Sequence, residues 1–305
     1  MTPSETIAAI DVGNSAIKVA LAKVSELITA TNDFSADDGP VRSQSFPLDQ
    51  PNWDQQICRW VQQHAGQATV SWWVSTVNHA ASRPLKDAVL GVSDSAPQSS
   101  RVGQDAWHHL TFEDVPLRIQ VDAPEKVGID RLLSAYAAST RFATPLVVVD
   151  AGSAVTVDCV RLDSDARPVF VGGAILPGIR LQHAALATGT EGLQQATDGI
   201  DPAKVAAMMP ATNTQQAIRL GVLAAVVGGV ERLAQEYARA DDHDAEATCP
   251  KDTSAKRLPI VLCGGDAATL SPYLRAPHQQ VPNLVCLGIF DLAIQQCQIA
   301  PSGLK

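Results

Sequence analysis

The sequence lacks an excess of basic residues. Lys and Arg total 23 against 32 Asp and Glu, which gives a formal net charge of -9 at pH 7. Neutralising nucleic-acid phosphates requires a basic face, so this charge argues against a general nucleic-acid binder. A phosphate-bearing substrate would meet a repulsive overall field. A phosphate site would therefore need local Lys or Arg, backbone N–H groups or a metal ion.

The sequence also lacks closely spaced cysteines and long apolar runs. Its six cysteines include no CxxC pair, which favours reduced thiols in a cytoplasmic protein over a disulfide framework or a zinc site. The longest apolar stretch, residues 220–230, is too short to span a bilayer, so we expect no membrane association. The first ten residues contain no basic segment, and we expect no signal peptide.

Segments that are strand-like and helix-like alternate along the 305 residues, of which 46% are hydrophobic. This pattern predicts an α/β protein. Strands are expected at 7–11, 16–22, 69–75, 146–150, 154–161, 168–175 and 259–263. Helices are expected at 53–65, 82–90, 130–141, 179–187, 202–208, 212–239 and 288–297. Loops are expected at 30–52, 91–106 and 238–257, the last as a solvated insertion.

A repeated pattern indicates duplication. The stretches "IDVGNSAIKVAL" and "VDAGSAVTVDCV" share a strand, Asp, any residue, Gly, a small polar residue and a second strand. They lie near the starts of two halves, 1–139 and 140–305, so we predict two similar α/β domains with a cleft between them. Two unrelated hairpins stay open as an alternative, because Gly with Asn or Ser suits tight turns in any case.

The two turns have the composition of a phosphate site. Gly13 lets a phosphate approach the backbone, and successive N–H groups can form an anion-binding concavity. Ser15 and, in the second turn, Ser153 add hydroxyl groups. Lys18 could neutralise a phosphate, and Asp11 could hold a hydrated Mg²⁺ accompanying ATP. The alternative for Lys18 is a solvated strand residue.

The stretch "VGIDRLL" carries a second candidate group. Asp130 stands just before a predicted helix, where an N-cap is the alternative role. Arg131 opposes the helix dipole in the first turn, which is understandable if it binds an anionic ligand and Gly128 leaves room for it. An Asp beside an anion-binding Arg could act as a general base on a hydroxyl.

Six stretches together resemble the type III pantothenate kinases. They are "DVGNSAIK", "VGIDR", "DAGSAVTVD", "GGAILPG", "NTQQAIRLGV" and "CGGDA", in that order. The closing "VPNLVCLGIFDLA" is similar to the C-terminus of that family. The resemblance implies the acetate and sugar kinase/Hsp70/actin fold, with two ribonuclease-H-like domains, and a homodimer.

The resemblance also implies the reaction and its residues. ATP would phosphorylate pantothenate to 4′-phosphopantothenate, the first step of coenzyme A synthesis, with Mg²⁺ and a monovalent cation, K⁺ or NH₄⁺. Asp130 matches the catalytic base and Asp150 the K⁺ ligand. Pantothenate contacts would come from Gly128, Ile129, Asp130, Arg131 and Thr190. ATP contacts would come from Asp11, Val12, Gly13, Asn14, Ser15, Ala16, Ile17, Lys18 and Ser153.

Two other functions remain open from the sequence. One is a non-catalytic or regulatory relative, because the family also resembles the Bvg accessory factors, which are proposed to act on transcription. The other is a kinase of the same superfamily that phosphorylates a different small alcohol. The presence of Asp130, Arg131 and Asp150 favours the enzyme, and the acidic net charge disfavours direct contact with DNA.

Overall fold

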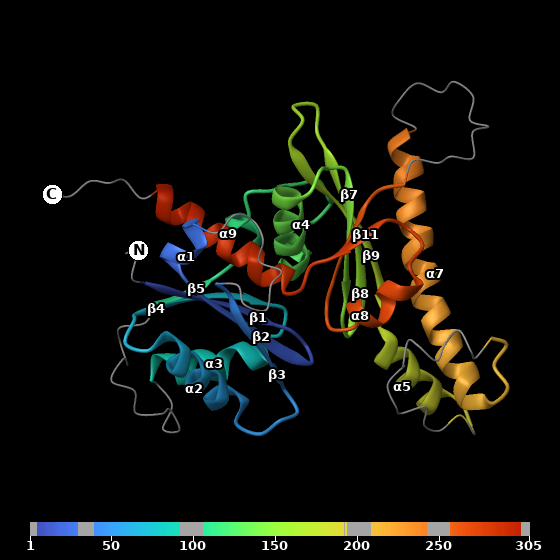
Figure 1. The fold of residues 1–305 in the computed structure, drawn as a ribbon, viewed down its shortest axis with the longest axis horizontal. Helices are drawn as coiled ribbons and strands as arrows, with labels where there is room; N and C mark the ends of the chain where they lie inside the picture. Colours follow the sequence, from blue (N-terminus) through green and yellow to red (C-terminus); the bar gives the residue numbers. More distant parts are fainter. Residues whose placement is uncertain are drawn as a thin grey trace. The chain divides into compact units, whose positions relative to one another are not determined.

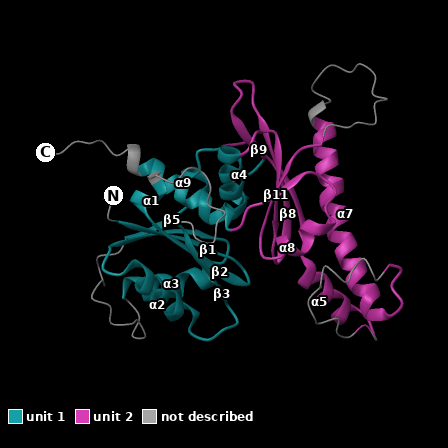
Figure 2. Cartoon of the chain, in the orientation of Figure 1, with its two compact units in different colours: residues 1–117, 122–141, 283–305 teal, residues 118–121, 142–282 magenta. Residues whose placement is uncertain are grey.

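The computed structural model describes residues 5–29, 40–91, 106–191, 193, 209–242 and 257–299. The chain forms two compact units (Figure 2). Unit 1 comprises residues 1–117, 122–141 and 283–305, and unit 2 comprises residues 118–121 and 142–282. The sequence pattern placed all of residues 140–305 in the second domain, whereas the C-terminal segment from residue 283 belongs to unit 1.

Unit 1 is built on a five-stranded sheet. Its strands are β1 (Thr6–Val12), β2 (Ala16–Lys23), β3 (Arg42–Pro47), β4 (Val70–Thr76) and β5 (Ala106–His109). Their order is β3-β2-β1-β4-β5. The pairs β1–β2 and β2–β3 are antiparallel, whereas β1–β4 and β4–β5 are parallel. All seven residues of β1 are buried, as expected for a central strand covered on both faces.

Helices cover both faces of the unit 1 sheet (Figure 1). They are α1 (Val24–Thr29), α2 (Trp53–Ala65), α3 (His79–Leu90), α4 (Ile129–Arg141) and α9 (Leu284–Ile299). Short 3₁₀ turns lie at Phe112–Asp114 and Pro124–Lys126. On one face, Ile57 of α2 and Leu85 of α3 pack with Ile10 and Val19 of the sheet in one apolar core. Helices α4 and α9 lie on the other face.

Helix α9 joins unit 1 because it packs against α4 and β1. Gly288 of α9 lies so close to α4 that a β-carbon there would fall 2.4 Å from the carbonyl oxygen of Leu133. The guanidinium of Arg141 forms a bidentate ion pair with Asp291, with N–O distances of 2.5 and 2.9 Å. These long-range contacts explain why the C-terminal segment departs from the predicted domain boundary.

Unit 2 repeats the same strand order. Its strands are β6 (Arg118–Ile119), β7 (Leu146–Ala151), β8 (Ala154–Leu162), β9 (Pro168–Pro177), β10 (Ile260–Cys263) and β11 (His278–Gln280). Their order is β11-β10-β7-β8-β9-β6. Strands β7 to β11 thus correspond to β1 to β5, with the same antiparallel and parallel pairs. This confirms the predicted duplicated α/β fold of the ribonuclease-H-like type.

The helices of unit 2 are α5 (Ile179–Gly189), α7 (Thr214–Asp242) and α8 (Ala267–Leu270), and a 3₁₀ turn lies at Ser271–Tyr273. Val222, Val226 and Val230 of α7 are buried in the same apolar core as Val155 and Val157 of β8. The spacing of these valines places them on one face of the helix, which therefore packs on the sheet.

Several predicted elements need correction. The predicted loop at 30–52 contains β3, and the predicted loop at 238–257 begins inside α7. The sequence pattern also missed β5, β6, β11, α1 and α8. The predicted helix at 202–208 lies outside the described residues. Within the described part of the chain, no helix is both long enough and apolar enough to cross a membrane.

Candidate active site

An aspartate and a lysine lie opposite each other on the two strands that flank the first predicted phosphate turn, in unit 1. Asp11 and Lys18 are register partners in β1 and β2. The Nζ atom of Lys18 lies 3.9 Å from Oδ2 of Asp11. Asp11 is only 7% exposed, and a buried carboxylate is costly unless an opposite charge or hydrogen bonds compensate it. Lys18 supplies part of that compensation and reaches the same end of the sheet as the turn.

The turn itself is held from two sides. The N–H of Gly13 donates to the carbonyl of Ala16, 3.1 Å away, and closes the hairpin. After β4, the N–H of Val77 donates to the carbonyl of Val12 at 3.2 Å. Asn78 caps α3 by accepting from the N–H of Ala81, and its Nδ2 donates to the carbonyl of Gly13 at 3.4 Å. The backbone of the turn is therefore fixed by its neighbours before any ligand arrives.

Cys286 of α9 lies close to the Asp11–Lys18 pair. Cys286 is 1% exposed, and its thiol donates to the carbonyl of Ala9, with the sulfur 3.8 Å away. Burial raises the pKa of the Cys286 thiol, the charge of Asp11 raises it further, and the charge of Lys18 lowers it. The thiol stays protonated at neutral pH and is not a candidate nucleophile.

The segment 128–131 opens α4, also in unit 1. The helix begins at Ile129, so Asp130 is its second residue rather than the residue before it, and the N-cap alternative does not hold. The carbonyl of Gly128 accepts from the N–H groups of Arg131 and Leu132 at 3.1 and 3.4 Å. Oδ1 of Asp130 accepts from the N–H of Arg131 at 2.9 Å. The helix start thus fixes the direction of the Asp130 carboxylate.

Gly128 connects this segment with the end of β4. A β-carbon at Gly128 would lie 2.5 Å from Oδ1 of Asp130 and 3.6 Å from Cγ1 of Val77. Because Val77 bonds to Val12 beside the turn, the start of α4 lies against the segment that holds the phosphate turn. Unit 1 therefore gathers Asp11, Lys18 and Asp130 on elements that meet around Val77.

The second predicted phosphate turn joins β7 and β8 in unit 2. The N–H of Gly152 donates to the carbonyl of Ala154 at 3.0 Å. The N–H of Gly178, which precedes α5, donates to the carbonyl of Ser153 at 3.1 Å. A β-carbon at Gly178 would fall 2.3 Å from the carbonyl oxygen of Gly152. Only glycine allows α5 to begin this close to the turn.

Asp150 lies at the end of β7, next to a glycine whose backbone conformation other residues rarely adopt. Gly264 follows β10 with a φ of +95°, and a β-carbon there would lie 2.4 Å from both Oδ1 of Asp150 and the carbonyl oxygen of Ala151. Asp150 pairs in register with Thr156 on β8 rather than with a cation. Its carboxylate makes no ion pair or side-chain hydrogen bond with another described residue.

Comparison with known proteins identifies the family. A model of the type III pantothenate kinases matches residues 7–236. A type III pantothenate kinase of Rhodopirellula baltica is 37% identical over 300 residues, which cover 94% of this chain and 98% of the relative. This chain belongs to the type III pantothenate kinase family.

A second relative agrees with that membership. A type III pantothenate kinase of a Synechococcus strain is 32% identical over 76% of this chain and 91% of its own length. Among solved structures, a gluconate kinase of Lactobacillus acidophilus aligns with 98% of this chain and 90% of its own, with a TM-score of 0.45 and 12% identity.

The structure limits how some of the expected pantothenate kinase residues could contact a ligand. Val12 and Ile17 are fully buried within the sheet, and Ile129 is 7% exposed, so these three residues shape the site from the core rather than offer side chains to ATP or pantothenate. Thr190 ends α5 on the surface of unit 2, where its hydroxyl donates to the carbonyl of Leu186 at 2.7 Å. Ser153 lies in the second turn.

Two residues of unit 2, Arg180 and Asp266, were not among the site residues expected from the sequence, although Asp266 lies in the stretch "CGGDA". Nη2 of Arg180, in the first turn of α5, lies 3.5 Å from the hydroxyl of Ser153. Burial raises the pKa of Asp266, whereas the positive charge of Arg180 lowers it. Arg180 therefore lies near both residues. The sequence could have indicated Arg180, because it is a cation in the first turn of a helix, where it opposes the helix dipole as Arg131 does.

A cation bound at either turn would need further oxygen ligands besides the single carboxylate there, such as water or substrate phosphates. The described residues contain no cluster of three or more His, Cys, Asp or Glu side chains that could hold a metal ion. Mg²⁺ commonly binds through one or two carboxylates together with water and substrate phosphates, which fits a single Asp11. At Asp150, the backbone of Gly264 packs so closely that any side chain at position 264 would clash with Oδ1.

Proposed function

We propose that this chain transfers the γ-phosphoryl group of ATP to the hydroxyl group of pantothenate and so forms 4′-phosphopantothenate for coenzyme A synthesis. The observation that carries the proposal is the convergence in unit 1 of the Asp11–Lys18 pair and Asp130 around the end of β4. Family membership supplies the substrates, and this convergence supplies a phosphate-binding turn beside a carboxylate.

In the proposed reaction, Asp130 is the general base. Its carboxylate accepts the proton of the pantothenate hydroxyl as the oxygen forms a bond to the γ-phosphorus. The bond between that phosphorus and the β,γ-bridging oxygen breaks, and ADP leaves. Phosphoryl transfer depends mainly on positioning and charge stabilisation, so the base provides only part of the acceleration.

Binding in the proposed site depends on charge placed locally. Lys18 neutralises phosphate charge and the N–H groups of residues 14 and 15 donate to phosphate oxygens, which offsets the negative field of the chain. Ser153 contributes a hydroxyl from the second turn, and Arg131 binds the pantothenate carboxylate. Asp11 would hold Mg²⁺, which would supply charge to shield the phosphates. Asp150 would hold K⁺ or NH₄⁺, which would supply a further positive charge.

The proposal is tested by a phosphorylation assay with ATP, Mg²⁺ and K⁺. Pantothenate should be required for ADP formation, and phosphopantothenate should appear in equal amount. Replacing K⁺ with Na⁺ should lower the rate, and NH₄⁺ should restore it. Absence of product would favour a non-catalytic relative, and faster phosphorylation of another small alcohol would favour a different kinase of the superfamily. Equal rates in all salts would refute the role of Asp150.

A homodimer is part of the proposal. In α7, the residues Gly221, Ala224, Ala225 and Gly228 are exposed and share one helical face, opposite the valines that pack on the sheet. Small residues let two helices approach closely. Light scattering should give about twice the chain mass of 32.2 kDa, and Ala225→Glu should lower it to the monomer mass. A wild-type monomer at every concentration would refute the dimer. The cytoplasmic location stays a prediction.

A further inference from the structure

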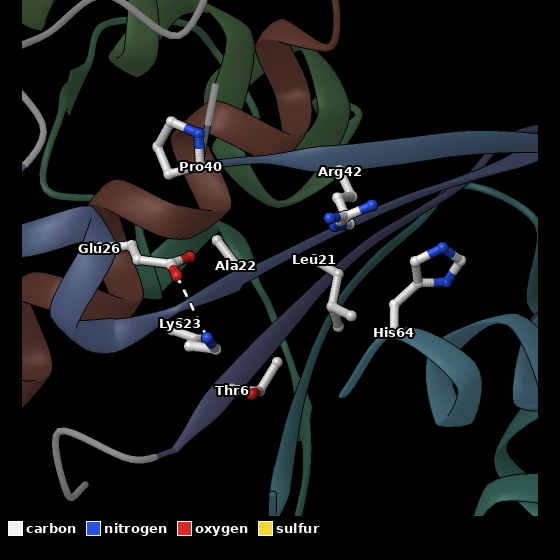
Figure 3. A pocket seen from close by; sticks show the side chains of 8 residues that line it. All are labelled: Thr6, Leu21, Ala22, Lys23, Glu26, Pro40, Arg42 and His64. Atoms are coloured by element: carbon white, nitrogen blue, oxygen red, sulfur yellow. Dashed lines mark ion pairs between the residues drawn. The ribbon is translucent and has the colours of Figure 1, made fainter. Parts of the chain in front are cut away.

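A pocket of about 430 Å³ lies at the opposite end of the β1–β2 hairpin from the phosphate turn. Figure 3 shows the side chains that line it, which come from the start of β1, the end of β2, α1, the start of β3 with the residue Pro40 before it, and the end of α2. They are Thr6, Leu21, Ala22, Lys23, Glu26, Pro40, Arg42 and His64. The volume falls within the range of small-molecule sites.

The pocket is locally basic on an acidic protein. Nζ of Lys23 is 3.3 Å from Oε1 of Glu26, and these two charges balance one another. Figure 3 shows this pair on one side of the pocket and Arg42 with His64 on the other. The guanidinium of Arg42 forms no ion pair or side-chain hydrogen bond with another described residue. Arg42 therefore leaves the lining with one uncompensated positive charge.

Two further polar groups of the lining could bind a ligand. The ring nitrogen Nδ1 of His64 lies 2.7 Å from the carbonyl oxygen of Trp60. A carbonyl only accepts, so Nδ1 carries the hydrogen and Nε2 is left for another partner. Thr6 is 2% exposed, and its hydroxyl has no hydrogen-bond partner among the described residues. A buried polar group without a partner is uncommon in folded proteins.

We propose that this pocket binds a small anion that carries one carboxylate or phosphate group, with Arg42 as its main contact. A guanidinium offers parallel N–H donors that match the paired oxygens of a carboxylate or phosphate. The net single positive charge of the lining suits a monoanion. Leu21, Ala22 and Pro40 provide an apolar wall for a short alkyl portion of the ligand.

This site is separate from the proposed catalytic site. Thr6 and Val12 are the two ends of β1, and six residue steps along a strand span about 20 Å. No residue of the pocket belongs to the segments 11–18 or 128–131. Binding at the pocket can therefore be measured without ATP or pantothenate, and a failure here leaves the proposed kinase reaction untouched.

The test is NMR of the full-length protein with histidine labelled at the Cε1 position. The His64 signal is assigned by its loss in His64→Gln. Acetate, isobutyrate and inorganic phosphate are titrated separately. We expect a saturable shift of the His64 signal, with a dissociation constant of about 10 mM or tighter for at least one of them. Tighter binding of isobutyrate than acetate would identify a carboxylate with an alkyl group, and a response to phosphate alone would identify a phosphate ligand.

The matched variants are Arg42→Met and Arg59→Met. Arg59 is an exposed arginine of α2 outside the pocket. Arg42→Met should weaken binding at least about tenfold, while Arg59→Met should bind as the wild type does. Both variants should retain the wild-type melting temperature and kinase rate. Absence of saturation in the wild type, or the same affinity in Arg42→Met, would overturn the proposal.

Discussion

The β1–β2 and β7–β8 hairpins occupy corresponding places in the two sheets, but different side chains lie opposite Asp11 and Asp150. In unit 1 the second-to-last residue of β1 is Asp11, and in unit 2 the second-to-last residue of β7 is Asp150; the next strand runs antiparallel in both units. The residues that connect the last paired residues of the two strands are 13–16 in the first turn and 152–154 in the second. The first turn is thus one residue longer.

The residue paired with each carboxylate also differs, although the pairing on the strands is the same in both units. Asp11 meets Lys18, while Asp150 meets Thr156. A carboxylate with its own cation suits a site where Lys binds phosphate. A carboxylate opposite a hydroxyl has no built-in counter-charge and is better suited to an added cation. The two units share a strand order, and the roles proposed for Asp11 and Asp150 differ in line with their register partners.

The largest expected effect tests whether the chemistry belongs to unit 1. Asp130→Asn keeps the shape of the side chain but removes the base, so kcat should fall about 10²–10⁴-fold, or roughly 3–5 kcal/mol of barrier. Asp122→Asn, at an exposed position of the same unit, is the control and should keep its rate. Steady-state kinetics with thermal melting separates catalysis from folding. A folded Asp130→Asn protein with normal kcat would remove Asp130 from the mechanism.

The next effect compares the register partners themselves. Lys18→Met should lower kcat/KM for ATP about 10- to 100-fold, because a hydrogen bond to a charged group contributes about 1.5–3 kcal/mol. Thr156→Val, at the equivalent position of unit 2, should change kcat/KM for ATP much less. Kinetics at varied ATP concentration measures both. Equal losses in the two variants would mean that the two turns do not differ in the way their side chains indicate.

A third experiment concerns the backbone beside Asp150. Gly264→Ala places a methyl group against the Asp150 carboxylate at a positive φ. We expect a loss of about 1–3 kcal/mol in the free energy of unfolding and a higher K⁺ concentration for half-maximal rate. The neighbouring Gly265 is the control, since a β-carbon there meets no atom within 4 Å. Urea unfolding of the two Ala variants should separate them, and equal stabilities would contradict the assigned strain.

The sequence predicted the elements that carry strong local signals. Strands β1, β2, β7 and β8 are apolar and buried, and the Asp–Gly turns between them are marked by residue type. The edge strands β3, β5 and β11 were missed, because most of their side chains are exposed and show no alternation of apolar and polar residues. Backbone pairing with a neighbouring strand forms such strands, and this pairing is not encoded locally.

The site was predictable to a similar degree. Asp11 and Lys18 lie in one short motif, so their proximity follows from the hairpin. The position of Asp130 beside that motif depends on Gly128 packing against Val77, a contact between distant parts of the sequence. The same applies to α9, whose Gly288 fits against Leu133. Contacts of this kind depend on tertiary packing rather than on any local pattern.

The smallest expected effect compares the residue just before α3, which follows β4 in unit 1, with the residue just before α8, which follows the corresponding strand β10 in unit 2. Asn78 in unit 1 caps α3 with its side chain, while Asp266 in unit 2 makes no such bond to α8. Burial raises the pKa of Asp266 above its ordinary value of 3.8. The folded protein therefore holds this proton to higher pH than the unfolded chain does. The free energy of unfolding should fall as pH rises from 3.8 through the raised pKa.

Replacing Asp266 with Asn removes this titration, so the stability difference between Asp266→Asn and the wild type should grow with pH across that window and then level off. Urea unfolding at a series of pH values measures it. Arg180→Gln gives the opposite test, because the charge of Arg180 lowers the pKa of Asp266. Without that charge the pKa should rise further, and the pH window of falling stability should extend to higher pH. If the curves of wild type and Asp266→Asn stay parallel, burial does not penalise the ionised Asp266, and the contrast with Asn78 is limited to the missing cap.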